Sequence, residues 1–200
     1  MKRSDQALKR AFDMIAASAC LLLLWPVIAI AALLARRDTG ASGLFHQTRI
    51  GRHGRPFTLH KIRTMRNVAG SSVTTVGDAR ITRLGRHFRR WKIDELPQLW
   101  NILRGDMSFV GPRPDVPGFA DRLKGDDRII LLLRPGITGP ATLKYRDEEA
   151  LLAAMDDPER FNAEAIWPDK VAINRAYVEN YSFATDLMLI WLTALGRKTS

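Results

Sequence analysis

The sequence predicts an α+β protein, mostly helical with few short strands, that is held to a membrane by a helical hairpin. Residues 14–35 form an apolar run without a single charged residue. Residues 80–91 and 92–103 repeat apolar side chains at helical spacing, and "FTLHKI" at 57–62 alternates as a short strand does. These observations favour a small globular domain with amphipathic helices at the membrane surface.

The apolar run divides the chain into two expected regions. Residues 1–37 would form a helix–break–helix in the membrane, and residues 38–200 a cytoplasmic, membrane-associated domain. A straight helix over the run would measure roughly 33 Å, about the thickness of a hydrocarbon core. Proline at position 26 removes a helical hydrogen bond in the middle of it. The run is therefore long enough to cross a bilayer but carries a natural point for a bend.

Basic residues flank the apolar run on both sides. Lys2, Arg3, Lys9 and Arg10 precede it, and Arg36 and Arg37 follow it at once. Since basic flanks prefer the cytoplasmic side, a single crossing cannot satisfy both ends, whereas a re-entrant hairpin bent at Pro26 can. A spanning helix with a proline kink is the alternative, and charge and proline alone support the two equally.

Charge is distributed unevenly along the chain, whose formal net charge is +10. Residues 1–100 hold 18 Lys and Arg against 6 Asp and Glu, whereas residues 101–200 hold 13 against 15. The basic half suggests an anionic partner: lipid headgroups, nucleic acid or a phosphorylated substrate. The single cysteine, Cys20, excludes an intrachain disulfide.

Several helices are expected after the apolar run. The helix from Arg80 to Trp91 is basic and amphipathic, which is typical of a helix in the headgroup layer or of one packed on a core with a solvated face. We also expect helices over 92–103, 119–133, 147–164 and 181–195, and loops over 68–79 and 134–140.

The strongest local signal is "KIDELPQLWNIL" at 92–103. Pro97 suits the first turn of a helix, which places Asp94 and Glu95 at its N-terminus, where the helix dipole favours their ionised forms. Two adjacent carboxylates can hold Mg²⁺, and an ionised Asp can attack phosphorus. The alternative is that the pair only caps the helix.

Four basic side chains are candidates for binding phosphate. Arg113 lies between two prolines in "GPRP", which would hold its guanidinium stiffly, unless the segment is only a rigid turn. Lys61 and Arg63 share one face of an extended stretch, either as a phosphate clamp or as a basic strand edge. Arg134 opens "RPGITGP", whose glycines leave backbone N–H groups accessible as an anion nest. The four histidines lack the spacing of zinc ligands.

Several segments of the chain, taken in order, resemble those of the bacterial sugar transferases. The resemblance is specifically to the monotopic phosphoglycosyl transferases in their minimal, single-domain form. The resemblance runs from about residue 7 to about residue 195. The matching segments are "KRAFD" (9–13), the apolar run with its proline, "QTRIGRHGRPFTLHKIRTM" (47–65), "KIDELPQLWNILRGDMSFVGPRP" (92–114), "RPGITG" (134–139) and "YVENYSFATDL" (177–187).

The resemblance implies a phosphoglycosyl transferase. Family members move a sugar 1-phosphate from a UDP-sugar to undecaprenyl phosphate and release UMP, the first membrane step of glycan or glycoconjugate assembly. It implies that Asp94 is the nucleophile of a covalent phosphosugar intermediate, that Glu95 helps to hold Mg²⁺, and that Arg113 binds a phosphate. Asp169 is a weaker candidate for the metal shell. Lys9, Arg10 and Asp13 fall on the family motif at the membrane entry.

The resemblance also implies a re-entrant helix that breaks at its proline and returns to the cytoplasmic face of the bacterial inner membrane. Anionic inner-leaflet lipids are then expected partners, and a homo-oligomer is one option. Trp25 stands where family members often carry Ser, so we expect the break to be held differently or to be shallower. Ile62 in place of Phe is an apolar exchange of little consequence.

Two functions of other classes remain as alternatives. One is a membrane-tethered nucleic-acid-binding protein, which lacks a recognisable binding motif, so nucleic acid is not an expected partner. The other is a non-catalytic membrane-anchored scaffold with a kinked single-pass anchor. Both alternatives predict that Asp94→Asn leaves function intact.

Overall fold

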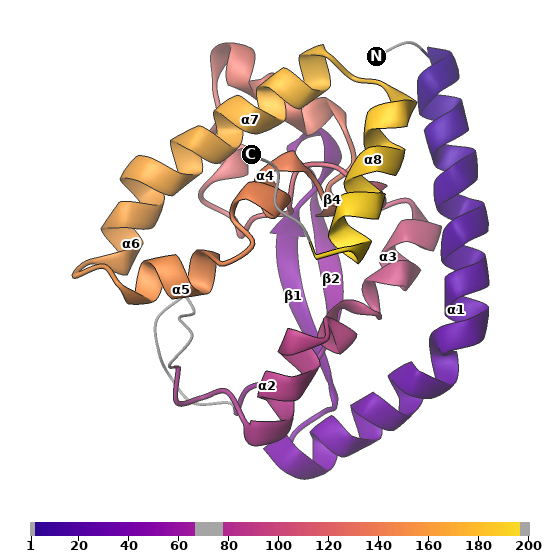
Figure 1. Ribbon diagram of the computed structural model, residues 1–200, viewed down its shortest axis with the longest axis vertical. Coiled ribbons are helices and arrows are strands. Elements are labelled where there is room, and N and C mark those ends of the chain that lie inside the picture. Colours follow the sequence, from indigo (N-terminus) through magenta and orange to yellow (C-terminus); the bar gives the residue numbers. More distant parts are fainter. Residues whose placement is uncertain (1–2, 67–77, 197–200) are drawn as a thin grey trace.

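The computed structural model describes residues 3–66 and 78–196. A long helix, α1 (Arg3–Thr39), runs along one side of a mixed body of short helices and strands (Figure 1). The predicted mostly helical α+β class is confirmed. Most of the loop predicted at 68–79 lies outside the described residues.

The helix α1 continues through Pro26 without interruption of its helical structure, and its second half runs in a different direction from its first (Figure 1). The proline therefore bends the helix but does not divide it in two, which corrects the expected helix–break–helix. Trp25, beside the proline, is 59% exposed. The expectation that Trp25 makes the break shallower or holds it differently stays a prediction.

Both halves of α1 pack against the same body. Ala17 in the first half is fully buried in a cluster with Leu59, Leu99, Ile102 and Met107. In the second half, Ala31 and Ala35 are buried against Ile62 and Phe88. Gly43 approaches the carbonyl of Ala32 so closely that a Cβ atom at position 43 would lie 1.8 Å from its oxygen. The chain thus folds back onto α1 directly after leaving it.

A β-hairpin follows α1 and fixes the position of several basic side chains. Strands β1 (Leu44–Ile50) and β2 (Pro56–Ile62) pair antiparallel, with Phe45 opposite Lys61. The short strand predicted at 57–62 is confirmed, and it pairs with β1, for which no strand was predicted. A turn at Arg52–Gly54 joins the two strands.

The predicted helices before and after the acidic pair are present. Helix α2 (Arg83–Arg90) begins at Thr82, whose side chain accepts a hydrogen bond from Gly85 N. Helix α3 (Gln98–Arg104) ends at Gly105, which has a φ of 88°. Strand β3 (Ser108–Val110) then pairs parallel with β4 (Gly136–Thr138). The segment 134–140, predicted as a loop, therefore contributes a short strand.

Two predicted helices are wrong. The stretch 119–133 contains only 3₁₀ turns, Ala120–Arg122 and Gly125–Leu132, because Gly125 has a φ of 56° and interrupts the helical path. The stretch 147–164 is divided before Pro158, since a residue that precedes proline disfavours the helical conformation. The elements in this part are α4 (Pro140–Lys144), α5 (Glu148–Ala153), α6 (Pro158–Phe161), a π turn (Asn162–Ile166) and α7 (Trp167–Glu179).

The last helix, α8 (Phe183–Ala194), confirms the helix predicted at 181–195. It lies beside the first half of α1 (Figure 1). Leu189 of α8 is buried with Val110, Leu143, Tyr177 and Val178, so this core joins α8 to β3, α4 and α7.

Candidate functional site

A backbone turn at Lys92 positions the acidic pair, Asp94 and Glu95. Lys92 is one of two described non-glycine residues with positive φ, at 55°, and it turns the chain between α2 and a 3₁₀ turn at Ile93–Glu95. Pro97 has helical dihedral angles and precedes α3 directly. Asp94 and Glu95 thus lie just before the N-terminus of α3, as predicted, and both are buried, with 6% and 7% of their surface exposed.

Glu95 is neutralised by two basic side chains from different parts of the chain. Arg113 Nη2 donates to its Oε1 at 2.9 Å, and Lys61 Nζ lies 3.4 Å from the same oxygen. Burial raises the pKa of Glu95, but Arg113, Lys61 and Lys92 outweigh it and hold that pKa well below its usual range. Glu95 is therefore ionised, and its charge places Arg113 and Lys61.

Asp94 differs from its neighbour. Its Oδ1 is buried and has no hydrogen-bond partner among the described residues. Burial raises the pKa of Asp94 and the charge of Glu95 raises it further, while Lys61 acts in the opposite direction. For Asp94, burial therefore opposes the preference for the ionised form that is expected at the helix N-terminus. An oxygen that is buried but bound to nothing is available to a ligand.

The segment around Arg113 is fixed to β1. Arg49 Nη1 donates to the carbonyl of Pro114 at 3.0 Å, and Ile50 N donates to the carbonyl of Asp115 at 2.9 Å. The Arg113 guanidinium is thereby held at Glu95, which raises the pKa of Arg113. Neither Arg49 nor Asp115 was predicted from the sequence; proximity to Arg113 in the chain was the only signal for Asp115. Burial raises the pKa of Asp115 to about 6 against the opposing effect of Lys170, Arg49 and Arg113.

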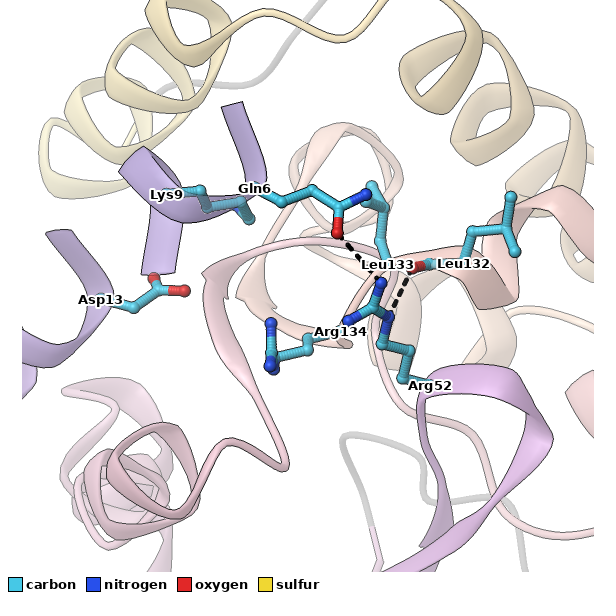
Figure 2. Close-up of a pocket in the computed structure, with 7 residues that line it drawn as sticks. All are labelled: Gln6, Lys9, Asp13, Arg52, Leu132, Leu133 and Arg134. Carbon is cyan, nitrogen blue, oxygen red and sulfur yellow. Dashed lines mark hydrogen bonds between the residues drawn. The ribbon is translucent and has the colours of Figure 1, made fainter. Parts of the chain in front are cut away.

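The predicted phosphate-binding residues separate into two groups. Lys61 and Arg113 meet at Glu95. Arg63 instead donates to the carbonyl of Ser42 at 2.6 Å and stacks on Phe45. Arg134 donates to the carbonyl of Gly105 at 2.8 Å, at the far end of α3, where it lines a hollow with Arg52 and Gln6 (Figure 2).

The predicted membrane-entry motif attaches α1 to the globular body. Lys9 forms a buried ion pair with Asp186 of α8. Arg10 donates to the carbonyls of Ile102 and Leu103 at 2.6 and 2.9 Å, in the last turn of α3. Asp13 accepts from Ser108 Oγ and Phe109 N, both at 3.1 Å.

The candidate metal ligands do not form one cluster. Asp169 accepts hydrogen bonds from Lys144 at 2.8 Å and from the Tyr145 hydroxyl at 2.7 Å. Within residues 3–66 and 78–196, no group of three or more His, Cys, Asp or Glu side chains is arranged to hold a metal ion. Of the three predicted ligands, Asp94 and Glu95 are neighbours in one turn, and Asp94 Oδ1 has no hydrogen-bond partner among the described residues, so a shared Mg²⁺ at this pair stays a prediction.

Comparison with known proteins identifies the family of the chain. A model of the bacterial sugar transferases matches residues 4–197. The chain is 35% identical to the exopolysaccharide production protein PSS of Rhizobium leguminosarum bv. phaseoli, over 98% of this chain and 97% of that protein. It is also 35% identical to the UDP-glucose:undecaprenyl-phosphate glucose-1-phosphate transferase of Caulobacter vibrioides, over 92% of this chain and 67% of that one. An Escherichia coli protein of the same name is 33% identical, over 94% of this chain and 40% of its own length. The chain belongs to the bacterial sugar transferase family.

Proposed function

We propose that this protein transfers a sugar 1-phosphate from a UDP-sugar to undecaprenyl phosphate and releases UMP, through a covalent intermediate on Asp94. The observation that carries the proposal is the unbound, buried Oδ1 of Asp94 beside a carboxylate that holds two basic side chains. The names of the relatives supply the two substrates, and the site supplies a nucleophile and phosphate-binding groups.

The reaction divides into two displacements at one phosphorus atom. An oxygen of Asp94 attacks the β-phosphorus of the UDP-sugar, and the bond from that phosphorus to the bridging oxygen breaks, so UMP leaves with the oxygen. A phosphate oxygen of undecaprenyl phosphate then attacks the same phosphorus and returns the Asp94 carboxylate. Arg113 and Lys61, which lie within reach of both steps, would bind the non-bridging oxygens. Mg²⁺, when bound at Asp94 and Glu95, would offset the diphosphate charge and stabilise UMP as the leaving group.

The membrane arrangement in this proposal is a re-entrant α1 at the cytoplasmic face of the inner membrane. The helix is long and apolar enough to cross a membrane, and 11% of its apolar window is buried. Both of its halves contact one globular body, at Asp186 near its start and at Phe88 near its end. That supports a helix that enters and returns, because a spanning helix would carry one end to the opposite side of the bilayer.

Exposed aromatic side chains outside α1 support the same arrangement. Trp91 follows α2, Trp100 lies on α3 and Trp191 on α8, and each is at least half exposed. Tryptophan is favoured at the level of lipid headgroups. With these helices at the interface, the acidic pair would lie where a lipid phosphate and a soluble donor can both reach it.

A UMP-release assay tests the proposal. The full chain, in undecaprenyl phosphate-containing detergent micelles with Mg²⁺, is incubated with a panel of UDP-sugars, and covalent labelling is followed with a radiolabelled donor. We expect UMP release with at least one donor, and Asp94→Asn should abolish both UMP release and labelling. Asp126→Asn, an exposed carboxylate, is the matched control. Labelling that persists in Asp94→Asn would exclude the proposed intermediate.

A further inference from the structure

Three arginines lie close together at the C-terminal end of α3, with Asp13 as a nearby carboxylate. Arg52 and Arg134 line the hollow shown in Figure 2, and Arg10 lies beside Arg134. Within the described parts of the chain, none of the three forms a salt bridge. The nearby carboxylate of Asp13 is bound by Ser108 and Phe109, and Lys9 is paired with Asp186.

The arginines retain donors that the protein does not use. Arg134 Nε donates to the carbonyl of Gly105. Arg52 Nε donates to the carbonyl of Leu132, and its Nη2 donates to Gln6 Oε1. Each guanidinium has five N–H donors, so several of them remain for a ligand at this hollow. Burial lowers the pKa of Arg134, and Arg10 and Arg52 lower it further, as expected for positive charges held close together.

This hollow is separate from the acidic pair. Asp94 precedes the N-terminus of α3, and Arg134 contacts Gly105 after its C-terminus, so the helix of 7 residues lies between them, roughly 10 Å of helix. Arg52 lies in the turn of the hairpin, and Lys61 is five positions beyond the start of β2, roughly 17 Å along the strand. A group bound by Arg52 and Arg134 is therefore not the one that reacts at Asp94.

We propose that Arg52 and Arg134, with the charge of Arg10 behind them, form a second binding site for a phosphate group, distinct from the reacting one. Guanidinium groups that line one hollow suit a phosphate, whose several oxygens accept paired hydrogen bonds. Gln6 of α1 borders the site, so a bound phosphate would also tie the start of α1 to the body. The source of the phosphate is either a phospholipid headgroup or a soluble phosphate.

Binding by the full chain in detergent tests this site and separates the two sources. One arm counts one-to-one phosphatidylglycerol adducts by native mass spectrometry. The other measures the thermal unfolding midpoint in inorganic phosphate against sodium chloride of equal ionic strength. A lipid adduct without an effect of inorganic phosphate assigns the site to a headgroup, and stabilisation by inorganic phosphate assigns it to phosphate in general.

Three variants decide whether binding occurs at this site. Gln6→Glu keeps an acceptor for Arg52 but adds a negative charge, so it should fold and bind phosphate at least tenfold more weakly. The double variant Arg52→Gln, Arg134→Gln should lose binding similarly, and Gln6→Glu provides the test if the double variant does not fold. Arg122→Gln, which removes an exposed arginine elsewhere, should bind as the wild type does.

Two outcomes would overturn the inference. One is that the wild-type protein binds neither probe. The other is that Gln6→Glu and Arg122→Gln weaken binding equally, because the anion would then be attracted by overall charge. Neither outcome concerns the transfer reaction, which is tested separately by UMP release.

Discussion

Side chains of opposite charge lie at the two ends of α3, and the two groups differ in what binds them. At the N-terminal end, Glu95 is bound by Arg113 and Lys61, while Asp94 has an oxygen bound to nothing among the described residues. At the C-terminal end, Arg10 and Arg134 bind only neutral backbone carbonyls. Both signs agree with the helix dipole, which favours anions at the start of a helix and cations at its end.

The difference indicates that the C-terminal end of α3 stabilises the fold, whereas the N-terminal end is suited to binding a ligand. Arg10 of α1 donates to two carbonyls at the C-terminal end of α3, so it strengthens the attachment of α1 to the body. The bare carboxylate at the other end gains no such hydrogen bond and is costly to bury. A protein retains a buried, unbound charge where a ligand will meet it, which is why the N-terminal end is the candidate active site.

The largest expected effect comes from removing the arginine that holds Glu95. Arg113→Ala should lower the rate of UMP release by roughly 10²–10³, because it removes a positioned donor for the transferred phosphate and leaves Glu95 with Lys61 alone. Arg113→Lys should recover part of the rate, since Lys keeps the charge but not the paired geometry. Arg122→Ala serves as the control, and a loss of less than threefold in Arg113→Ala would place Arg113 outside the site.

A second carboxylate, that of the half-buried Asp115, lies near Arg113 and extends the comparison from activity to stability. The pKa of Asp115 is raised from 3.8 to about 6, so between these values the native state binds more protons than the unfolded state does. The free energy of unfolding should then fall as the pH rises through this range, by about 3 kcal/mol in total. This loss of stability is absent below pH 4 and complete above pH 6.

Asp115→Asn isolates that contribution, because Asn resembles the protonated carboxyl group. We expect a higher thermal unfolding midpoint than that of the wild type at pH 7.5 and a similar one at pH 4. Asp126→Asn at the exposed surface should change neither value appreciably. An equal difference between wild type and Asp115→Asn at both pH values would show that burial of this charge is not the cause.

A substitution at the C-terminal end of α3 should lower the stability of the protein. Arg10→Gln removes two hydrogen bonds from a charged group to the carbonyls of Ile102 and Leu103, which should lower the free energy of unfolding by about 2 kcal/mol. Chemical denaturation in detergent measures it. Arg104→Gln, whose side chain is 57% exposed beside Asp106, should cost less than about 1 kcal/mol. Equal losses in the two variants would contradict a specific role of Arg10.

The parts of the fold that could be predicted depend on nearby residues. The order "KIDELP" contains the turn, the acidic pair and the helix start within six positions, so Asp94 and Glu95 were placed correctly. Helices α2, α3 and α8 follow from apolar periodicity. Apolar periodicity also predicted a helix over 119–133, which is wrong, because the positive φ of Gly125 interrupts the helical path.

The rest depends on contacts between distant segments. The register of β1 and β2 brings Lys61 to Glu95, but Arg63, one residue after β2, lies at Ser42. Arg134 was predicted to bind a substrate phosphate, and the pairing of β4 with β3 carries it to the far end of α3 from the acidic pair. Local sequence contains no signal for either placement, nor for the attachment of Arg49 to Pro114.

The smallest expected effect is a shift, along the pH axis, of the acidic side of the profile of labelling rate against pH. Asp94 must be ionised to attack phosphorus, and its pKa is raised, so the labelling rate should begin to fall at a higher pH than an ordinary Asp would give. Labelling by a UDP-sugar without undecaprenyl phosphate is the suitable measurement, because the lipid phosphate titrates too. Lys61→Gln removes the cation that most opposes the rise, so it should move the acidic side further upward, and Lys92→Gln should move it less. An acidic side that stays in place in Lys61→Gln would mean that the group controlling labelling is not a carboxylate beside Lys61, and the contrast between the two ends of α3 would lose its functional meaning.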